Sequence, residues 1–149
     1  AILDFGCTRS MGSRTRVMAF VKACCHSGFK ETFQFVPCCT RFSFAHSQAS
    51  KCFERLVINF PTTLPCSTEV DILEEGSVPI LISLQQMRNL YMGFQHTQNC
   101  DYLTCEAFAL KNYPLPISIS NHLLLDLCNL KSSPQRVECS FLEQDLDHS

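Results

Sequence analysis

Tryptophan is absent from the sequence, and both glycine and charged residues are scarce. The 149 residues include five glycines, and 17% of them are charged, whereas 46% are hydrophobic. So apolar a composition excludes an intrinsically disordered chain and predicts one domain with a hydrophobic core. The formal net charge is −2, and no run of Lys or Arg stands out. These features argue against direct binding of nucleic acid, which needs basic patches to contact phosphates.

Long apolar runs are also missing. The longest, at 78–82 and 123–125, are far shorter than the roughly 20 residues of a membrane-spanning helix. Asp4 and Arg9 interrupt the first residues, which disfavours a signal peptide. We therefore expect no membrane partner and an intracellular, cytoplasmic location.

Cysteine, in contrast, is unusually frequent, with eleven residues. The count is odd and two pairs are adjacent, at 24–25 and 38–39, so a disulfide framework is disfavoured. Neither adjacent pair has the spacing that lets two thiolates reach one zinc ion. We expect reduced, mostly buried thiols in a reducing compartment, and no metal or cofactor. A cysteine-rich metal-binding domain is kept as a remote alternative.

Short β-strands dominate the predicted secondary structure. Apolar side chains such as Phe33 and Phe35 alternate with polar neighbours, as in a half-buried strand. Pro37 is expected to end the strand that contains them. The pattern predicts strands at 1–3, 32–36, 41–44, 52–60 and 69–73, a strand buried on both faces at 78–82, a hairpin of 94–97 with 102–108, and one or two strands within 117–127.

A first helix is predicted after the first strand. Apolar residues recur at spacings of three and four from Val17 to Cys24, which places them on one face of a helix. Ser13 is the expected N-cap of this helix and Gly28 its stop.

A second helix is predicted from Ser83, because Ser83 and Gln86 have the spacing of a capping box. This helix should have about ten residues and end at Gly93. Many short strands with two helices indicate a mainly β fold, a small closed barrel with one or two short helices.

The sharpest motif is Leu-Asp-Phe-Gly-Cys-Thr at 3–8. Asp4 follows a buried strand, and Gly6 allows a tight turn and the close approach of a partner. The Thr8 hydroxyl can orient the loop. An aspartic protease needs this arrangement to present a carboxylate to water. The alternative is an ordinary turn, in which Asp4 binds the amides of its own loop.

Three segments, taken in order, carry a family resemblance. Residues 2–8 match the pattern [LI]-[LI]-D-[ST]-G-[AC]-[TS] except at Phe5, and residues 78–90 combine a buried strand with a helix. Between them, Phe-Ser-Phe-Ala-His-Ser at 42–47 is similar to a flap segment. In these segments the chain resembles the retropepsin-like aspartic proteases of retrotransposon Pol polyproteins, particularly copia-type elements.

The resemblance implies a domain organisation. A closed barrel of the acid-protease type would cover residues 1–110. The family has at least one further strand before the one that leads to Asp4, so the domain is expected to be truncated at its N-terminus. Residues 111–130 would add one or two strands, and the polar residues 131–149 would form a flexible tail.

The resemblance also implies the activity of an aspartic endopeptidase of a retroelement. Asp4 would be catalytic in a symmetric homodimer, with one Asp4 from each chain beside a shared water, while Gly6 and Thr8 would support the loop. The substrate would be a polypeptide, the chain's own polyprotein, and no cofactor is implied. The substrate-binding candidates are Phe44, His46 and Ser47 in the flap and Ile80 and Ile82 in the subsites.

Phe5 departs from the family pattern. The family has Ser or Thr there, and that hydroxyl cross-links the two catalytic loops of the dimer. Phenylalanine has no donor and is larger, so it would disturb the dimer axis or pack against the same residue of the partner. This keeps a second hypothesis open: a catalytically inactive retropepsin-fold module for dimerisation or binding, in which Asp4 is vestigial.

Overall fold

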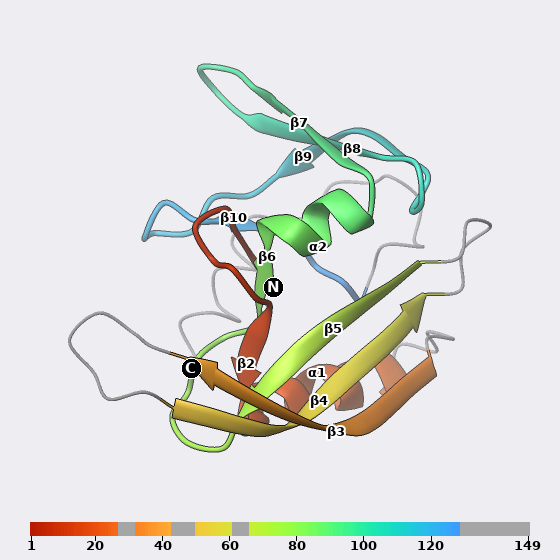
Figure 1. Cartoon of the computed structure of the whole chain (residues 1–149). Helices are drawn as coiled ribbons and strands as arrows, with labels where there is room; N and C mark the ends of the chain where they lie inside the picture. Colours follow the sequence, from red (N-terminus) through yellow and green to blue (C-terminus); the bar gives the residue numbers. More distant parts are fainter. Residues whose placement is uncertain (27–31, 43–49, 61–65, 129–149) are drawn as a thin grey trace.

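The computed structural model describes residues 1–26, 32–42, 50–60 and 66–128 (Figure 1). Within these ranges it has two helices, α1 (Arg14–His26) and α2 (Leu84–Asn89). The strands are β1 (Ile2–Asp4), β2 (Met11–Ser13), β3 (Thr32–Phe42), β4 (Ser50–Phe60), β5 (Cys66–Leu73), β6 (Leu81–Ser83), β7 (Met92–His96), β8 (Asp101–Cys105), β9 (Leu110–Leu115) and β10 (Leu123–Leu124).

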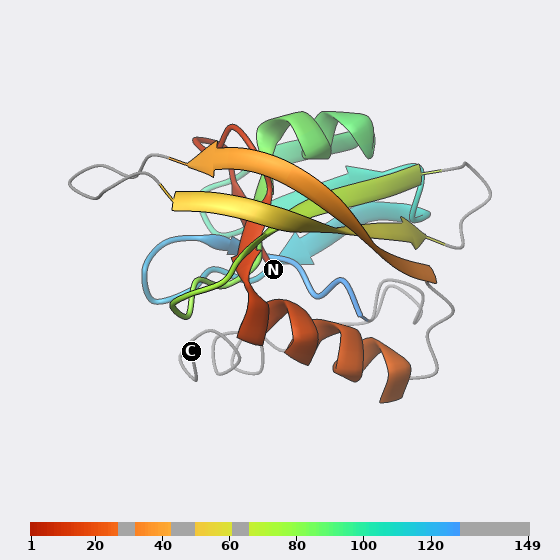
Figure 2. The ribbon, with the colours of Figure 1, turned by 60° about the horizontal axis from the view of Figure 1, so that its bottom comes forward.

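Seven strands form one mixed sheet in the order β10-β1-β6-β2-β5-β4-β3, and β7, β8 and β9 form a second, antiparallel sheet. In the large sheet β1 is parallel to β6 and β2 is parallel to β5, whereas the other neighbours are antiparallel. Figure 2 shows α1 along one face of the twisted strands β3 to β5. Helix α2 lies between this sheet and the three-stranded sheet (Figure 1).

The predicted mainly β fold with two helices is confirmed. The predicted barrel closure is not found in the described residues, because the large sheet ends at β10 on one side and at β3 on the other. A barrel closes only when its end strands pair with each other. Here β10 pairs with β1 and β3 pairs with β4.

A single hydrophobic cluster joins the two sheets and both helices. Its central side chains are almost fully excluded from water, and burial of this kind is the main source of folding free energy. These side chains are Val17, Leu56, Ile58, Val70, Ile72, Ile82, Met87, Leu90, Leu103 and Leu125. The two sheets therefore share one core.

Strand β3 continues past Pro37, so the prediction that Pro37 ends it is wrong. Pro37 pairs with Glu54 of β4, and the register shifts between Pro37 and Thr40. Within the described sheet β3 pairs only with β4, and a strand at the end of a sheet can accept a residue without an N–H. The place of β3 at the end of the sheet therefore allows Pro37 within the strand, and the local sequence pattern does not show that place.

The second helix and the strand before it are both shorter than predicted. Strand β6 has three residues and α2 has six. The predicted cap is confirmed, since the Ser83 hydroxyl accepts the Gln86 amide at 3.3 Å. The helix ends before Tyr91, which has a φ of 57°, rather than at Gly93, which lies in β7.

The first helix agrees with its apolar pattern, because Val17 and Cys24 are buried. Ser13 has a different role from the predicted cap. Its hydroxyl donates to the Glu75 carbonyl at 3.2 Å and accepts the Val78 amide at 2.7 Å. The residue thus secures the loop between β5 and β6 to the start of α1.

The predicted hairpin is confirmed by the antiparallel pairing of β7 with β8. Strand β9 precedes the strands predicted within 117–127, although it overlaps residues 111–130, which were expected to add one or two strands. Neither described helix has the length and apolarity that a membrane span requires.

Candidate functional site

Asp4 is the last residue of β1, at the point where two parallel strands end together. Leu3 pairs with Ile82 and Asp4 pairs with Ser83, and α2 begins directly after Ser83. Leu3 and Ile82 are buried in the core, whereas the side chain of Asp4 is only half-buried. Asp4 therefore lies where the chain leaves the core, with its carboxylate at the carboxyl end of β1 and beside the end of β6.

A tight turn follows Asp4. The Gly6 amide donates to the Asp4 carboxylate at Oδ1 (3.0 Å), and the Cys7 amide donates to the Asp4 carbonyl (3.2 Å). A Cβ added to Gly6 would lie 3.6 Å from Oδ1, an ordinary contact, and Gly6 is not among the residues with positive φ. The turn itself does not require a glycine here. Gly6 instead leaves exposed backbone that a partner could approach.

The aromatic ring of Phe5 packs against another ring of the same chain. Its ring packs edge-to-face on Phe94 of β7, with centroids 5.1 Å apart and planes at 73°. The side chain is still 46% exposed. The contact ties the turn after β1 to the three-stranded sheet.

The remaining residues of the motif do not contact the carboxylate of Asp4 by hydrogen bonds. Thr8 is exposed, and in the described residues its hydroxyl makes no hydrogen bond to Asp4. The Cys7 thiol donates to the Arg9 carbonyl at 2.7 Å. Burial raises the pKa of the Cys7 thiol, and the negative charge of Asp4 raises it further, so the thiol stays neutral beside the carboxylate.

The far end of the same loop is held by Asp71, which lies in β5. The Arg9 guanidinium donates through Nε to Asp71 Oδ2 at 2.9 Å, and Arg55 Nε donates to Oδ1 at 2.6 Å. The side chain of Asp71 is 2% exposed. A carboxylate this buried is tolerated because both oxygens face a positive charge.

The charges of this cluster also act on their neighbours. The hydrogen bond with Asp71 raises the pKa of Arg55, which keeps that guanidinium charged. Burial raises the pKa of the Cys52 thiol to about 11, and the negative charge of Asp71 adds to the effect. Asp71 is therefore a structural anion whose two oxygens are both occupied.

The alternating sequence pattern predicts an exposed side chain at Asp71, whereas this side chain is buried. Alternation along β5 would put Asp71 on the same face as Glu69, which is exposed. The Arg9 side chain reaches over this part of β5 and forms an ion pair with Asp71. The two partners, Arg9 and Arg55, are 62 and 16 positions away in the sequence, so no local signal could have identified them.

Ser10 completes the anchoring of the loop. The Ser83 amide donates to Ser10 Oγ at 2.9 Å, and the Asp71 amide donates to the Ser10 carbonyl at 3.0 Å. The segment 5–10 thus begins at Asp4, beside Ser83, and ends at residues bound to both Ser83 and Asp71.

Of the predicted substrate-binding residues, Ile80 and Ile82 lie in the described part of the chain, and Ile82 precedes Ser83, which pairs with Asp4. Phe44, His46 and Ser47 lie outside the described residues. Ile80 and Ile82 are 7% and 1% exposed, so both belong mainly to the core.

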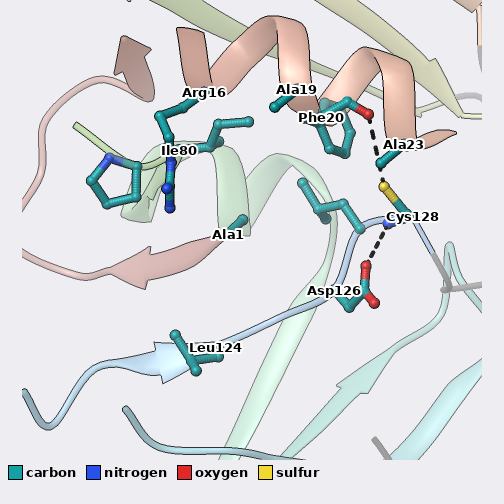
Figure 3. Close-up of a pocket in the computed structure, with 11 residues that line it drawn as sticks. Ala1, Arg16, Ala19, Phe20, Ala23, Ile80, Leu124, Asp126 and Cys128 are labelled. Atoms are coloured by element: carbon teal, nitrogen blue, oxygen red, sulfur yellow. Dashed lines mark hydrogen bonds between the residues drawn. The ribbon is translucent and has the colours of Figure 1, made fainter. Parts of the chain in front are cut away.

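A cavity of about 220 Å³ lies between α1 and the segment after β10 (Figure 3). Ile80 contributes to its wall, but Asp4 does not. Its lining is Ala1, Arg16, Ala19, Phe20, Ala23, Pro79, Ile80, Leu124, Asp126, Leu127 and Cys128. The cavity is therefore separate from the turn that carries Asp4.

No three His, Cys, Asp or Glu side chains in the described ranges come together as metal ligands. No known family, curated protein or solved structure matches the chain.

Proposed function

We propose that the chain is an aspartic endopeptidase of the retropepsin type that acts as a homodimer. The observation that carries the proposal is the position of Asp4, at the carboxyl end of a buried strand and at the start of an exposed turn. The resemblance of residues 2–8 and 78–90 to the family supports it. The proposal includes the finer fold assignment, an open form of the acid-protease fold in the described residues, with residues 42–47 as its flap.

The proposed mechanism uses one water between two Asp4 carboxylates. Two carboxylates about 3 Å apart cannot both stay ionised, so the pair shares a proton. The ionised group takes a proton from the water, and the protonated group donates to the peptide carbonyl. No covalent intermediate forms. In each chain the Gly6 amide would fix Oδ1, leaving Oδ2 to face the water.

The dimer follows from the number of suitable carboxylates. The motif provides one Asp4 per chain, and Asp71 is engaged at both oxygens by Arg9 and Arg55. A symmetric pair would bring two copies of Asp4 to one axis. The proposed substrate is a polypeptide, the polyprotein that would contain the chain.

One observation favours the second candidate, a non-catalytic module for dimerisation or binding. Phe5 has no hydroxyl to cross-link two catalytic loops, and its ring is engaged with Phe94. Under this alternative Asp4 would serve only as the acceptor of the Gly6 amide in its own turn.

The test is cleavage of an unfolded protein substrate between about pH 4 and pH 7, where a shared-proton dyad acts. We expect Asp4→Asn to lower the rate by about 10²–10⁴-fold, and pepstatin to inhibit the unaltered chain. Asp101→Asn, at the start of β8, is the matched control and should retain activity. Cleavage that survives Asp4→Asn would contradict the proposal. A folded chain that forms dimers without cleaving would favour the non-catalytic module.

A further inference from the structure

Two cysteines far apart in the sequence bring their sulfur atoms together. Cys24 lies in α1, and Cys128 follows β10. Their Sγ atoms are 2.9 Å apart, although the residues are 104 positions apart in the chain. Neither of them is joined in a disulfide. The sequence did not indicate this pair, because no spacing rule connects the two residues.

The backbone around Cys128 holds its thiol in place. The Cys128 amide donates to Asp126 Oδ1 at 3.0 Å, and its thiol lies 3.9 Å from the Phe20 carbonyl (Figure 3). Leu125 and Leu127 on either side of Asp126 are 0% and 2% exposed. The segment is thus anchored in the core, and the approach of the two sulfur atoms is part of the fold.

We propose that Cys24 and Cys128 form a reversible disulfide when the chain meets a small-molecule disulfide of the glutathione type. Cys128 is the half-buried member of the pair, whereas Cys24 is 0% exposed. Cys128 therefore reacts first.

The reaction is two successive thiol–disulfide exchanges. The Cys128 thiolate attacks one sulfur of the small disulfide and releases one small thiolate. The Cys24 thiolate then attacks Cys128 Sγ and releases the second. The two protons lost by the cysteines end on the released thiols. The protein is oxidised by two electrons and the small disulfide is reduced by two.

The bond would stabilise the segment that follows the short strand β10. Strand β10 has two residues and pairs with β1, the strand that ends at Asp4. Linking Cys128 to Cys24 would join the segment after β10 to α1 by a covalent bond. Because the bond closes a loop of about 100 residues, it restricts the unfolded chain strongly and should raise the melting temperature by about 10 °C.

The experiment exposes the full chain to graded ratios of oxidised and reduced glutathione, followed by trapping and tryptic digestion. Cleavage at lysine and arginine places Cys24 and Cys25 together in the peptide 23–30 and Cys128 in the peptide 112–131. We expect these two peptides to be linked, with loss of two hydrogen atoms from the intact mass.

Cys25→Ser is the matched control, because Cys25 adjoins Cys24 in the same peptide but is exposed. This variant should keep the link and the rise in melting temperature, whereas Cys24→Ala and Cys128→Ser should lose both. Retention of the link in Cys24→Ala, its loss in Cys25→Ser, or no link at any glutathione ratio would overturn the proposal. None of these results depends on whether the chain cleaves peptides.

Discussion

Asp4 precedes the segment 5–10, Asp71 of β5 binds the far end of that segment, and the two carboxylates have opposite surroundings. Asp4 is half-buried, and its carboxylate accepts one backbone amide through Oδ1. Asp71 is buried, and each of its oxygens accepts from a guanidinium. Asp4 thus has one oxygen without a hydrogen bond in the described residues, whereas both oxygens of Asp71 are held by guanidinium groups. The same residue type thus suits chemistry at one site and anchoring at the other.

The two sites are also physically connected. The segment 5–10 starts at Asp4 and ends with Arg9 and Ser10, both of which bind Asp71. If Asp4 is catalytic, as proposed, then Asp71 positions the loop that carries it. The expected difference in role between Asp4 and Asp71 can be tested by substituting the residues at each end of the loop separately.

The largest expected loss of stability comes from Asp71→Asn. Removing this charge leaves Arg9 and Arg55 without their shared anion, which should lower the free energy of unfolding by about 3 kcal/mol. Asp4→Asn should lower it by less than about 1 kcal/mol, because Asp4 is half-buried and makes one local bond. Urea denaturation at neutral pH measures both values. Equal losses would show that the two aspartates do not differ in structural role.

The two arginines should contribute unequally. The side chain of Arg55 is 20% exposed and that of Arg9 is 44% exposed. We expect Arg55→Ala to cost about 2 kcal/mol and Arg9→Ala about 1 kcal/mol, because solvent screens the more exposed pair. Double-mutant cycles with Asp71→Asn measure the coupling of each arginine to the carboxylate. A larger coupling for Arg9 would reverse this ranking.

Phe5→Thr tests whether the aromatic contact stabilises the turn after Asp4 at the expense of activity. Losing the edge-to-face contact with Phe94 should cost about 1 kcal/mol. Under the proposed function the new hydroxyl, which the family has at this position, should raise the rate of substrate cleavage. Phe53→Thr, on β4 and 60% exposed, is the control and should change neither quantity. An unchanged stability together with an unchanged rate would show that Phe5 neither stabilises the turn nor limits cleavage.

Gly6→Ala should have the smallest effect on folding, below about 0.5 kcal/mol, because its Cβ would make only an ordinary contact. The same change at Gly12 should cost about 1–3 kcal/mol, since that Cβ would lie 3.1 Å from an Ile80 side-chain carbon. Thermal unfolding compares the two variants. A Gly6→Ala chain that folds normally but no longer forms dimers would indicate that a partner approaches this turn.

The parts of the fold that follow from neighbouring residues were predictable. The strand ending at Asp4, the Ser83 cap of α2 and the buried Val17 face of α1 each depend on residues within a few positions. The end of β3 was mispredicted at Pro37, because a proline is tolerated once the strand lies at the end of a sheet. The surroundings of Asp71 were missed, because its partner Arg9 is distant in the sequence.

The sequence by itself determined the mainly β character, the two helices and the placement of an aspartate at the end of a buried strand. Periodicity and capping specify these features, and both depend on residues within one or two turns of a helix or within a single strand. Only the tertiary structure decided that β1 runs beside β6, that Asp71 is clamped by two arginines and that Cys24 meets Cys128. These contacts join segments 16 to 104 residues apart, and they form because the two sheets bury one common core.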